Sequence, residues 1–212
     1  MVAFVLATCS LATADVLAGV TVRTGTDSAD WSQLGPDGTT VSSPFTLQSA
    51  RGVGITGSFA GSAGGVVQQE GVDWTGNFAP GDNLLWTNSP GQGPLTLGFS
   101  SGLYQVGLQI QADFVGAFTA TIDAYNGATF LGTFTENGVS NSNEDNSAIY
   151  LGIRDLTARN ITGVVISLSS CTQDCGDFAV NQLSLTTPEP GSLILLASGV
   201  LGLAGAARRR FS

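Results

Sequence analysis

The 212-residue chain has no lysine and no histidine, and its basic residues are seven arginines. Without histidine, neither a Ser-His-Asp triad nor a metal site built on imidazole can form. Glutamate is also scarce, at Glu70, Glu136, Glu144 and Glu189. Lysine and glutamate are common on exposed helix faces, so their shortage favours strands and turns, as do the 29 glycines.

Positive charge is the next shortage. Between Gly19 and Thr187, fourteen acidic residues stand against four arginines, a difference of 14 − 4 = 10 negative charges. Such a domain repels phosphate backbones, so nucleic acid is not an expected partner. An acidic surface suits solubility outside the cell or divalent cations, and a merely solvated surface is the simpler interpretation.

The first residues have the pattern of a secretory signal peptide. Met1 to Leu11 is short and apolar, and small residues of the A-x-A type follow at Ala12-Thr13-Ala14 and again at Val16-Leu17-Ala18. We expect a signal helix within residues 1–18, removed together with Cys9, and a folded domain over 19–187. No basic residue precedes the apolar run, so the alternative is a buried N-terminal strand.

The last 25 residues form three parts in a fixed order. Pro188-Glu189-Pro190 cannot be helical, because proline lacks an amide hydrogen and restricts the residue before it. Residues 191–207 carry no charge, and a helix of that length is about 25 Å long, at the short limit of a membrane span. Arg208, Arg209 and Arg210 close the chain and predict a cytoplasmic end, so the domain lies outside the inner membrane.

This order resembles the PEP-CTERM sorting signal at 188–212. The resemblance implies recognition and cleavage by an exosortase, a membrane-embedded cysteine protease. It also implies a protein exported to the inner membrane with its domain facing the periplasm, and then placed at the cell surface or in the extracellular matrix of a bacterium that makes exopolysaccharide. An ordinary single-pass anchor is the alternative.

Period-two alternation dominates the domain. From Tyr104 to Phe114 alternate residues are apolar, and Gln105, Gln109 and Gln111 fall on the opposite face, which predicts a strand with glutamines toward solvent. A second strand ends at Tyr125, the Asn126-Gly127 pair predicts a hairpin turn, and a return strand over 128–135 should turn again at Glu136-Asn137-Gly138.

Further strands are expected along the whole domain. They cover 20–23, 39–48, 53–59, 95–99, 148–154, 161–169 and 178–185, the last with a β-bulge at Asn181-Gln182 where its phase slips. Many short strands with frequent turns predict an all-β fold, an antiparallel jelly-roll-like β-sandwich. Residues 107–185 also resemble the ectodomains of PEP-CTERM proteins, which are similar to lectin-like and carbohydrate-binding sandwiches and often carry Asp at the position of Asn181.

Cys171 and Cys175 lie four residues apart between two expected strands. In an oxidising compartment they should form a disulfide, worth about 2 kcal/mol for so small a loop. Zinc is the weaker alternative, since it needs about four ligands.

Two sets of residues are candidates for ligand contact. Trp31, Trp74 and Trp86 stand beside polar residues in loop-like stretches, as in sugar sites where aromatic faces stack, although a core tryptophan is the commoner case. Glu144 and Asp145 lie in the polar loop 141–146 and could ligate Ca²⁺, or simply be solvated.

The sequence therefore favours a non-enzymatic exported protein that binds or organises exopolysaccharide, with no cofactor apart from a conceivable calcium ion. One alternative is an adhesive or structural protein that binds other proteins. A polysaccharide-cleaving enzyme using two carboxylates is the last, and the sequence singles out no such pair.

Overall fold

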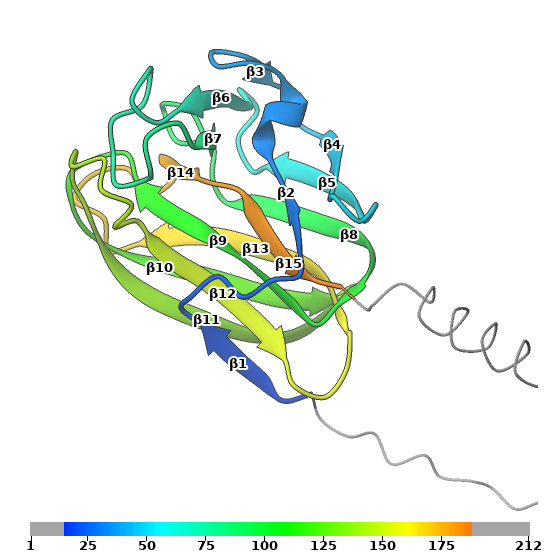
Figure 1. The fold of residues 1–212 in the computed structure, drawn as a ribbon. Coiled ribbons are helices and arrows are strands. Elements are labelled where there is room, and N and C mark those ends of the chain that lie inside the picture. Colours follow the sequence, from blue (N-terminus) through cyan, green and yellow to red (C-terminus); the bar gives the residue numbers. More distant parts are fainter. Residues whose placement is uncertain (1–14, 188–212) are drawn as a thin grey trace, which may run out of the picture.

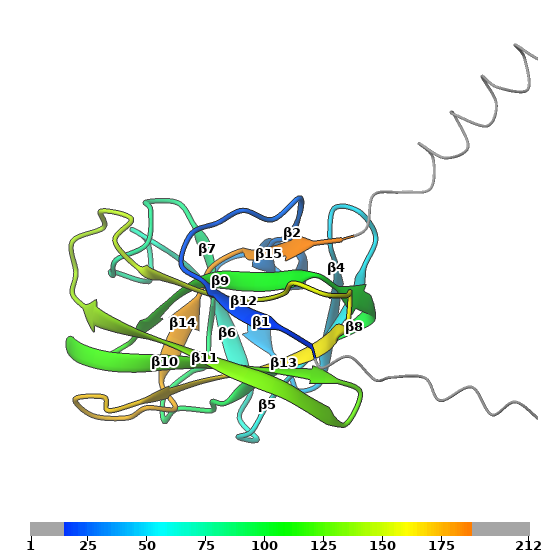
Figure 2. The same ribbon diagram turned by 90° about the horizontal axis from the view of Figure 1, so that it is seen from below.

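The computed structural model describes residues 15–187, and two antiparallel sheets pack face to face in it (Figures 1 and 2). The predicted antiparallel jelly-roll-like β-sandwich is confirmed. Most of the expected signal peptide and the whole tail from Pro188 lie outside the described residues. Within residues 15–187, no helix is long and apolar enough to cross a membrane.

One sheet has nine strands. Its path runs through β1 (Leu17–Val20), β12 (Ile149–Asp155), β9 (Gln105–Ala112), β14 (Phe178–Val180), β7 (Asn83–Trp86), β6 (Gly65–Gln69) and β3 (Thr40–Val41). Off this path, β15 (Leu183–Thr186) pairs with both β9 and β2 (Asp27–Ala29). A 3₁₀ helix, η1 (Trp31–Leu34), follows β2.

The second sheet has six strands in the order β11 (Thr129–Ser140), β10 (Gly116–Asn126), β13 (Ile161–Ser169), β8 (Leu95–Leu103), β5 (Gly54–Phe59) and β4 (Phe45–Gln48). Alternate residues of both sheets point inward, so Leu97, Leu108 and Ile122 are fully buried between them. Each such side chain contributes about 1.5–3 kcal/mol of apolar burial.

The hairpin at Asn126-Gly127 is confirmed, but the second turn predicted at Glu136-Asn137-Gly138 is wrong. Strand β11 continues through these residues, pairing Asn137 with Thr119 and Gly138 with Phe118. A Cβ at Gly138 would lie 2.3 Å from the Phe118 ring, so the glycine makes room for an aromatic side chain. A glycine in a strand therefore marked close packing here, not a turn.

The N-terminal strand begins earlier than the expected 20–23. Leu17 pairs with Asp155 and Ala18 with Arg154, so the expected signal-peptide boundary after residue 18 falls inside β1. Before the strand, the Asp15 carboxylate accepts a hydrogen bond from Asn160 Nδ2 at 2.8 Å.

Candidate functional site

The outer face of the nine-stranded sheet is largely covered, which corrects the expectation of solvent-facing glutamines. Gln105 and Gln111 of β9 are 2% and 3% exposed, because chain segments cross above them. Gln111 Oε1 accepts from the backbone N–H of Asn77 at 2.6 Å, and its Nε2 donates to the carbonyl of Asn141 at 3.1 Å. The amide of one strand residue thus fastens two loops to the sheet.

The first of these loops, residues 70–82, is organised by a buried carboxylate. Glu70 is 1% exposed, and its Oε1 accepts from the Gly76 N–H at 2.6 Å. Burial raises the pKa of Glu70, the amides of Gly76 and Phe78 oppose that rise, and the charge of Glu144 adds to it. The loop is therefore fixed from inside and forms a stable wall beside the sheet.

Beside this loop the sheet face opens into a polar cleft of about 400 Å³. Its lining comes from distant parts of the chain: Val22, Arg23, Ala79, Asp82, Gln109, Asn146, Tyr150 and Asn181. Polar groups converging in a concave site are typical of binding sites for small polar ligands.

Asn181 is the centre of the cleft's hydrogen-bond network. Its Oδ1 accepts from the Gln109 N–H at 3.0 Å, and its Nδ2 donates to Gln109 Oε1 at 2.6 Å and to Asp82 Oδ2 at 3.1 Å. The residue stands where β14 ends and β15 has not begun, so its side chain replaces the missing ladder bonds. The predicted bulge at Asn181-Gln182 is confirmed: between the pairs Val180–Ile110 and Ser184–Gly107, residues 181–183 stand opposite only residues 108–109 of β9.

Arg23 forms the basic rim of the cleft. Its two terminal nitrogens donate to Gln182 Oε1 at 2.8 Å and to Asn181 Oδ1 at 3.4 Å. A guanidinium group has five N–H donors in one plane, so these bonds hold that plane in place and leave donors for a ligand. On the opposite side, Gln109 Nε2 donates to Asn146 Oδ1 at 2.9 Å.

Tyr150 lies on the floor of the cleft. Its ring occupies the space above Gly107 and Gly152, where a Cβ would lie 2.6 Å from the hydroxyl oxygen and 3.0 Å from the ring respectively. The residue is 7% exposed, and its hydroxyl makes no hydrogen bond among residues 15–187. Burial raises the pKa of the phenol, against smaller opposite effects of the polar side chains of Ser184 and Gln105 and of the Arg23 charge. Because the hydroxyl oxygen is closed off from solvent, Tyr150 presents its ring to the cleft and its hydroxyl lies beneath the surface.

The tryptophans do not form the expected exposed set. Trp31 is 0% exposed, and its Nε1 donates to the Asn181 carbonyl at 2.8 Å, so the prediction that it contacts a ligand is wrong. Its indole fills the core beneath the cleft and supports the backbone of Asn181 there.

Trp74 and Trp86 are brought together, away from Trp31. Their rings pack edge to face with centroids 6.0 Å apart, in a small cluster with Phe78, Leu84 and Ala179 under the 70–82 loop. Trp74 is 6% exposed and Trp86 is partly buried. Their main contribution in this structure is to pack the loop onto the sheet.

Trp86 is also tied to a buried acid. Its Nε1 donates to Asp177 Oδ1 at 2.6 Å, and Asp177 is 0% exposed. Burial raises the pKa of Asp177 to about 6, opposed by the Trp86 bond and assisted by the charge of Asp113. A raised carboxyl pKa is typical of a general acid, but Asp177 is fully buried and lies outside the lining of the cleft.

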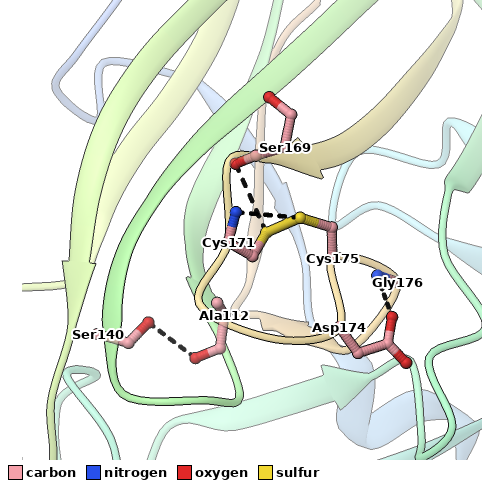
Figure 3. Close-up of a disulfide and its surroundings, with 7 residues drawn as sticks. All are labelled: Ala112, Ser140, Ser169, Cys171, Asp174, Cys175 and Gly176. Atoms are coloured by element: carbon pink, nitrogen blue, oxygen red, sulfur yellow. Dashed lines mark hydrogen bonds between the residues drawn. A yellow bond between two sulfur atoms is a disulfide. The ribbon is translucent and has the colours of Figure 1, made fainter.

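The predicted disulfide is present between Cys171 and Cys175, with Cα atoms 5.4 Å apart (Figure 3). It closes the loop from β13 to β14, inside which Asp174 Oδ1 accepts from the Gly176 N–H at 2.8 Å. Asp174 Oδ2 accepts from the Gly91 N–H at 2.8 Å, which links this loop to the one after β7. The disulfide therefore holds the end of the sandwich that carries Asp177.

Glu144 and Asp145 face different partners. Asp145 Oδ1 accepts a hydrogen bond from the Ser147 N–H at 3.1 Å, and hydrogen bonding to Ser147 is the chief cause of its lowered pKa. The negative charge of Glu144 instead raises the pKa of Glu70. Among residues 15–187, no three acidic or cysteine side chains gather as a metal site would require. The same loop instead places Asn146 at the cleft.

The sequence patterns did not identify five residues of the cleft lining: Arg23, Asp82, Gln109, Asn146 and Tyr150. Only the alternation of glutamines on β9 placed Gln109 on the correct face. The others come from loops and strands whose proximity depends on sheet order.

The fold and this cleft define an all-β sandwich with a preorganised polar site. Residues 186–210 match the PEP-CTERM protein-sorting motif, which indicates where the protein is sent. The motif implies export, membrane anchoring before processing, and processing by an exosortase.

Solved structures with a similar chain course share little sequence. A DUF4465 family protein from Bacteroides caccae has 13% identity and a TM-score of 0.46, covering 80% of this chain and 100% of its own. A carbohydrate-binding module of Cellvibrio mixtus lichenase 5A, in complex with cellotriose, has 12% identity and a TM-score of 0.24, with coverages of 81% and 98%. No curated protein matches the chain. Likeness at this level does not establish function.

Proposed function

We propose that the protein is a non-enzymatic module of the cell surface or extracellular matrix, and that its polar cleft binds exopolysaccharide. Its tail holds it in the inner membrane, with the sandwich facing the periplasm, until an exosortase cleaves near Pro188-Glu189-Pro190. The proposal rests on the sorting motif for the location and on the cleft for the activity.

The exposed guanidinium of Arg23 carries the binding half of the proposal. It lies at the rim of a cleft whose polar groups are already held by one another, so the site is rigid before a ligand arrives. A guanidinium has five N–H donors and Arg23 makes three bonds to Asn181 and Gln182, so a sugar hydroxyl can accept from the donors that are left. Asp82, which also lines the cleft, supplies an acceptor.

Arg23→Gln tests this site at its exposed rim. We expect affinity for the host's exopolysaccharide to fall about tenfold, since a hydrogen bond from a charged donor is worth about 1.5 kcal/mol or more. Stability should change little, because the bonds that Arg23 makes to Gln182 are exposed. Arg154→Gln is the matched control, as Arg154 is exposed on β12 and lies outside the cleft lining.

Calcium is tested in the same assay. Because Glu144 and Asp145 face different partners, we expect affinity to be equal with calcium and with a chelator. A calcium-dependent affinity lost in Asp145→Asn would instead restore a metal to the site.

A further inference from the structure

The outer face of the six-stranded sheet, opposite the polar cleft, carries a groove of about 770 Å³. Its polar side chains are hydroxyls and amides, among them Thr46, Gln48, Thr56 and Ser100, around the half-buried glycines Gly54 and Gly98. Within the described residues, this lining has no charged side chain.

One row of paired residues crosses all six strands, and its first three members, Thr46, Thr56 and Gly98, line this groove. Thr46 pairs with Thr56, Thr56 with Gly98, and Gly98 with Gly163. The row continues from Gly163 to Tyr125 and from Tyr125 to Phe130. At about 4.8 Å per strand, the five steps span about 24 Å.

The protein's own packing does not explain Gly98, where a Cβ would meet only the Thr56 carbonyl, at 3.9 Å. At Gly163 a Cβ would lie 3.2 Å from the Leu97 carbonyl, which is a tight approach, so that glycine is partly required by the neighbouring strand. Neither glycine has a positive φ. Elsewhere in the same sheet, Gly57 and Gly138 are required by the Phe45 and Phe118 rings, which leave no room for a Cβ.

Glycine in a strand interior costs stability and often marks a place where a ligand approaches the backbone. At one end of the row, the Tyr125 and Phe130 rings pack edge to face with centroids 5.6 Å apart, and Phe130 is 55% exposed. The groove and the row that extends from it thus combine a backbone surface without a side chain at its centre, hydroxyl and amide side chains beside it and a partly exposed aromatic pair at one end. This combination suits a chain of sugar rings.

We propose that this groove is a second glycan site, and that it binds a neutral, extended polysaccharide chain along the row from Thr46 to Phe130. The uncharged lining selects against charged polymers, and the net charge of −9 repels polyanions. A length of about 24 Å favours oligosaccharides over single sugars. This inference shares the sugar-binding role proposed above but uses different residues.

The test compares two variants of residues 15–187, which contain both sheets. Gly98→Val fills the groove with a side chain that favours strands, and Ser167→Val adds bulk to the same face outside the groove lining. The probes are cellohexaose and maltohexaose, two neutral chains of different shape, with cellobiose and alginate for comparison. Binding is measured by calorimetry and the oligomeric state by light scattering.

We expect at least one hexasaccharide to bind more tightly than cellobiose, and alginate not to bind at this site. Gly98→Val should lower hexasaccharide affinity about tenfold or more, equivalent to about 1.4 kcal/mol, without lowering the melting temperature. Ser167→Val should leave it unchanged.

The groove proposal is overturned if neither hexasaccharide binds, or if Gly98→Val binds like the parent. It is also overturned if Gly98→Val changes only the oligomeric state, since the face then contacts a second copy. Exopolysaccharide binding that depends on Arg23 would survive each of these results, so failure of the groove is distinct from failure of the cleft.

Discussion

The buried carboxyl of Asp177 predicts that stability falls as the pH rises. Asp177 is 0% exposed, and its pKa in the folded protein is about 6 against an ordinary value of 3.8. Below pH 3.8 the group is protonated in both the folded and unfolded states and has no effect. Between 3.8 and 6 the unfolded chain ionises first, so the free energy of unfolding decreases.

The size of the effect follows from the two pKa values. Each pH unit between them is worth about 1.4 kcal/mol, so full ionisation costs the folded protein about 3 kcal/mol above pH 6. Asp177→Asn removes the charge and keeps an oxygen that can accept the Trp86 indole bond. The variant should be more stable than the parent by up to about 3 kcal/mol at pH 7, and nearly equal to it below pH 4.

Urea unfolding of residues 15–187 at pH 4, 5, 6 and 7 measures this difference. Glu136→Gln removes one negative charge from the edge strand β11 and serves as the control for net charge. A direct readout is the indole N–H resonance of Trp86, which should move with a midpoint near pH 6. The N–H of Trp31, bonded to a backbone carbonyl, should not follow it. Equal stability of Asp177→Asn and parent at pH 7 would refute the reasoning.

Three further predictions concern the fold and its processing. The double variant Cys171→Ser, Cys175→Ser should lose about 2 kcal/mol in urea unfolding, and a loss below about 0.5 kcal/mol would mean that the Asp174 bonds hold the loop alone. Trp31→Phe removes the hydrogen bond to the buried Asn181 carbonyl and should cost about 1–3 kcal/mol, whereas a neutral result would contradict the support assigned to that indole. The intact mass of the native protein should place its N-terminus at Asp15, after Ala12-Thr13-Ala14. Cleavage after Ala18 would remove two of the four residue pairs that join β1 to β12, so an N-terminus at Gly19 would contradict this prediction.

The sequence predicted the sandwich because alternation survives wherever one sheet face packs against the other. Strand β13 was predicted at its observed bounds, and the hairpin at Asn126-Gly127 followed from its turn residues. Strands β6 and β7 were missed, since neither Val66-Val67 in β6 nor Leu84-Leu85 in β7 alternates with polar residues. In β7 both faces are buried, because the 70–82 loop covers the outer one.

The candidate site was less accessible to sequence reasoning. Arg23, Tyr150 and Asn181 are far apart along the chain and meet only because β12, β9 and the β14–β15 bulge are neighbours. The expectation that the tryptophans are exposed failed for a physical reason. Their polar neighbours mark short loops, but the large apolar rings still pack inward. The disulfide was predicted correctly, because two cysteines separated by four residues have few other geometric arrangements.

The most direct test of the central claim is the affinity of residues 15–187 for exopolysaccharide isolated from the host, measured for the parent, Arg23→Gln and Arg154→Gln. We expect saturable binding that weakens about tenfold in Arg23→Gln, with little change of stability, and is unchanged in Arg154→Gln. Absence of binding by the folded parent, or equal binding by all three proteins, would contradict the claim.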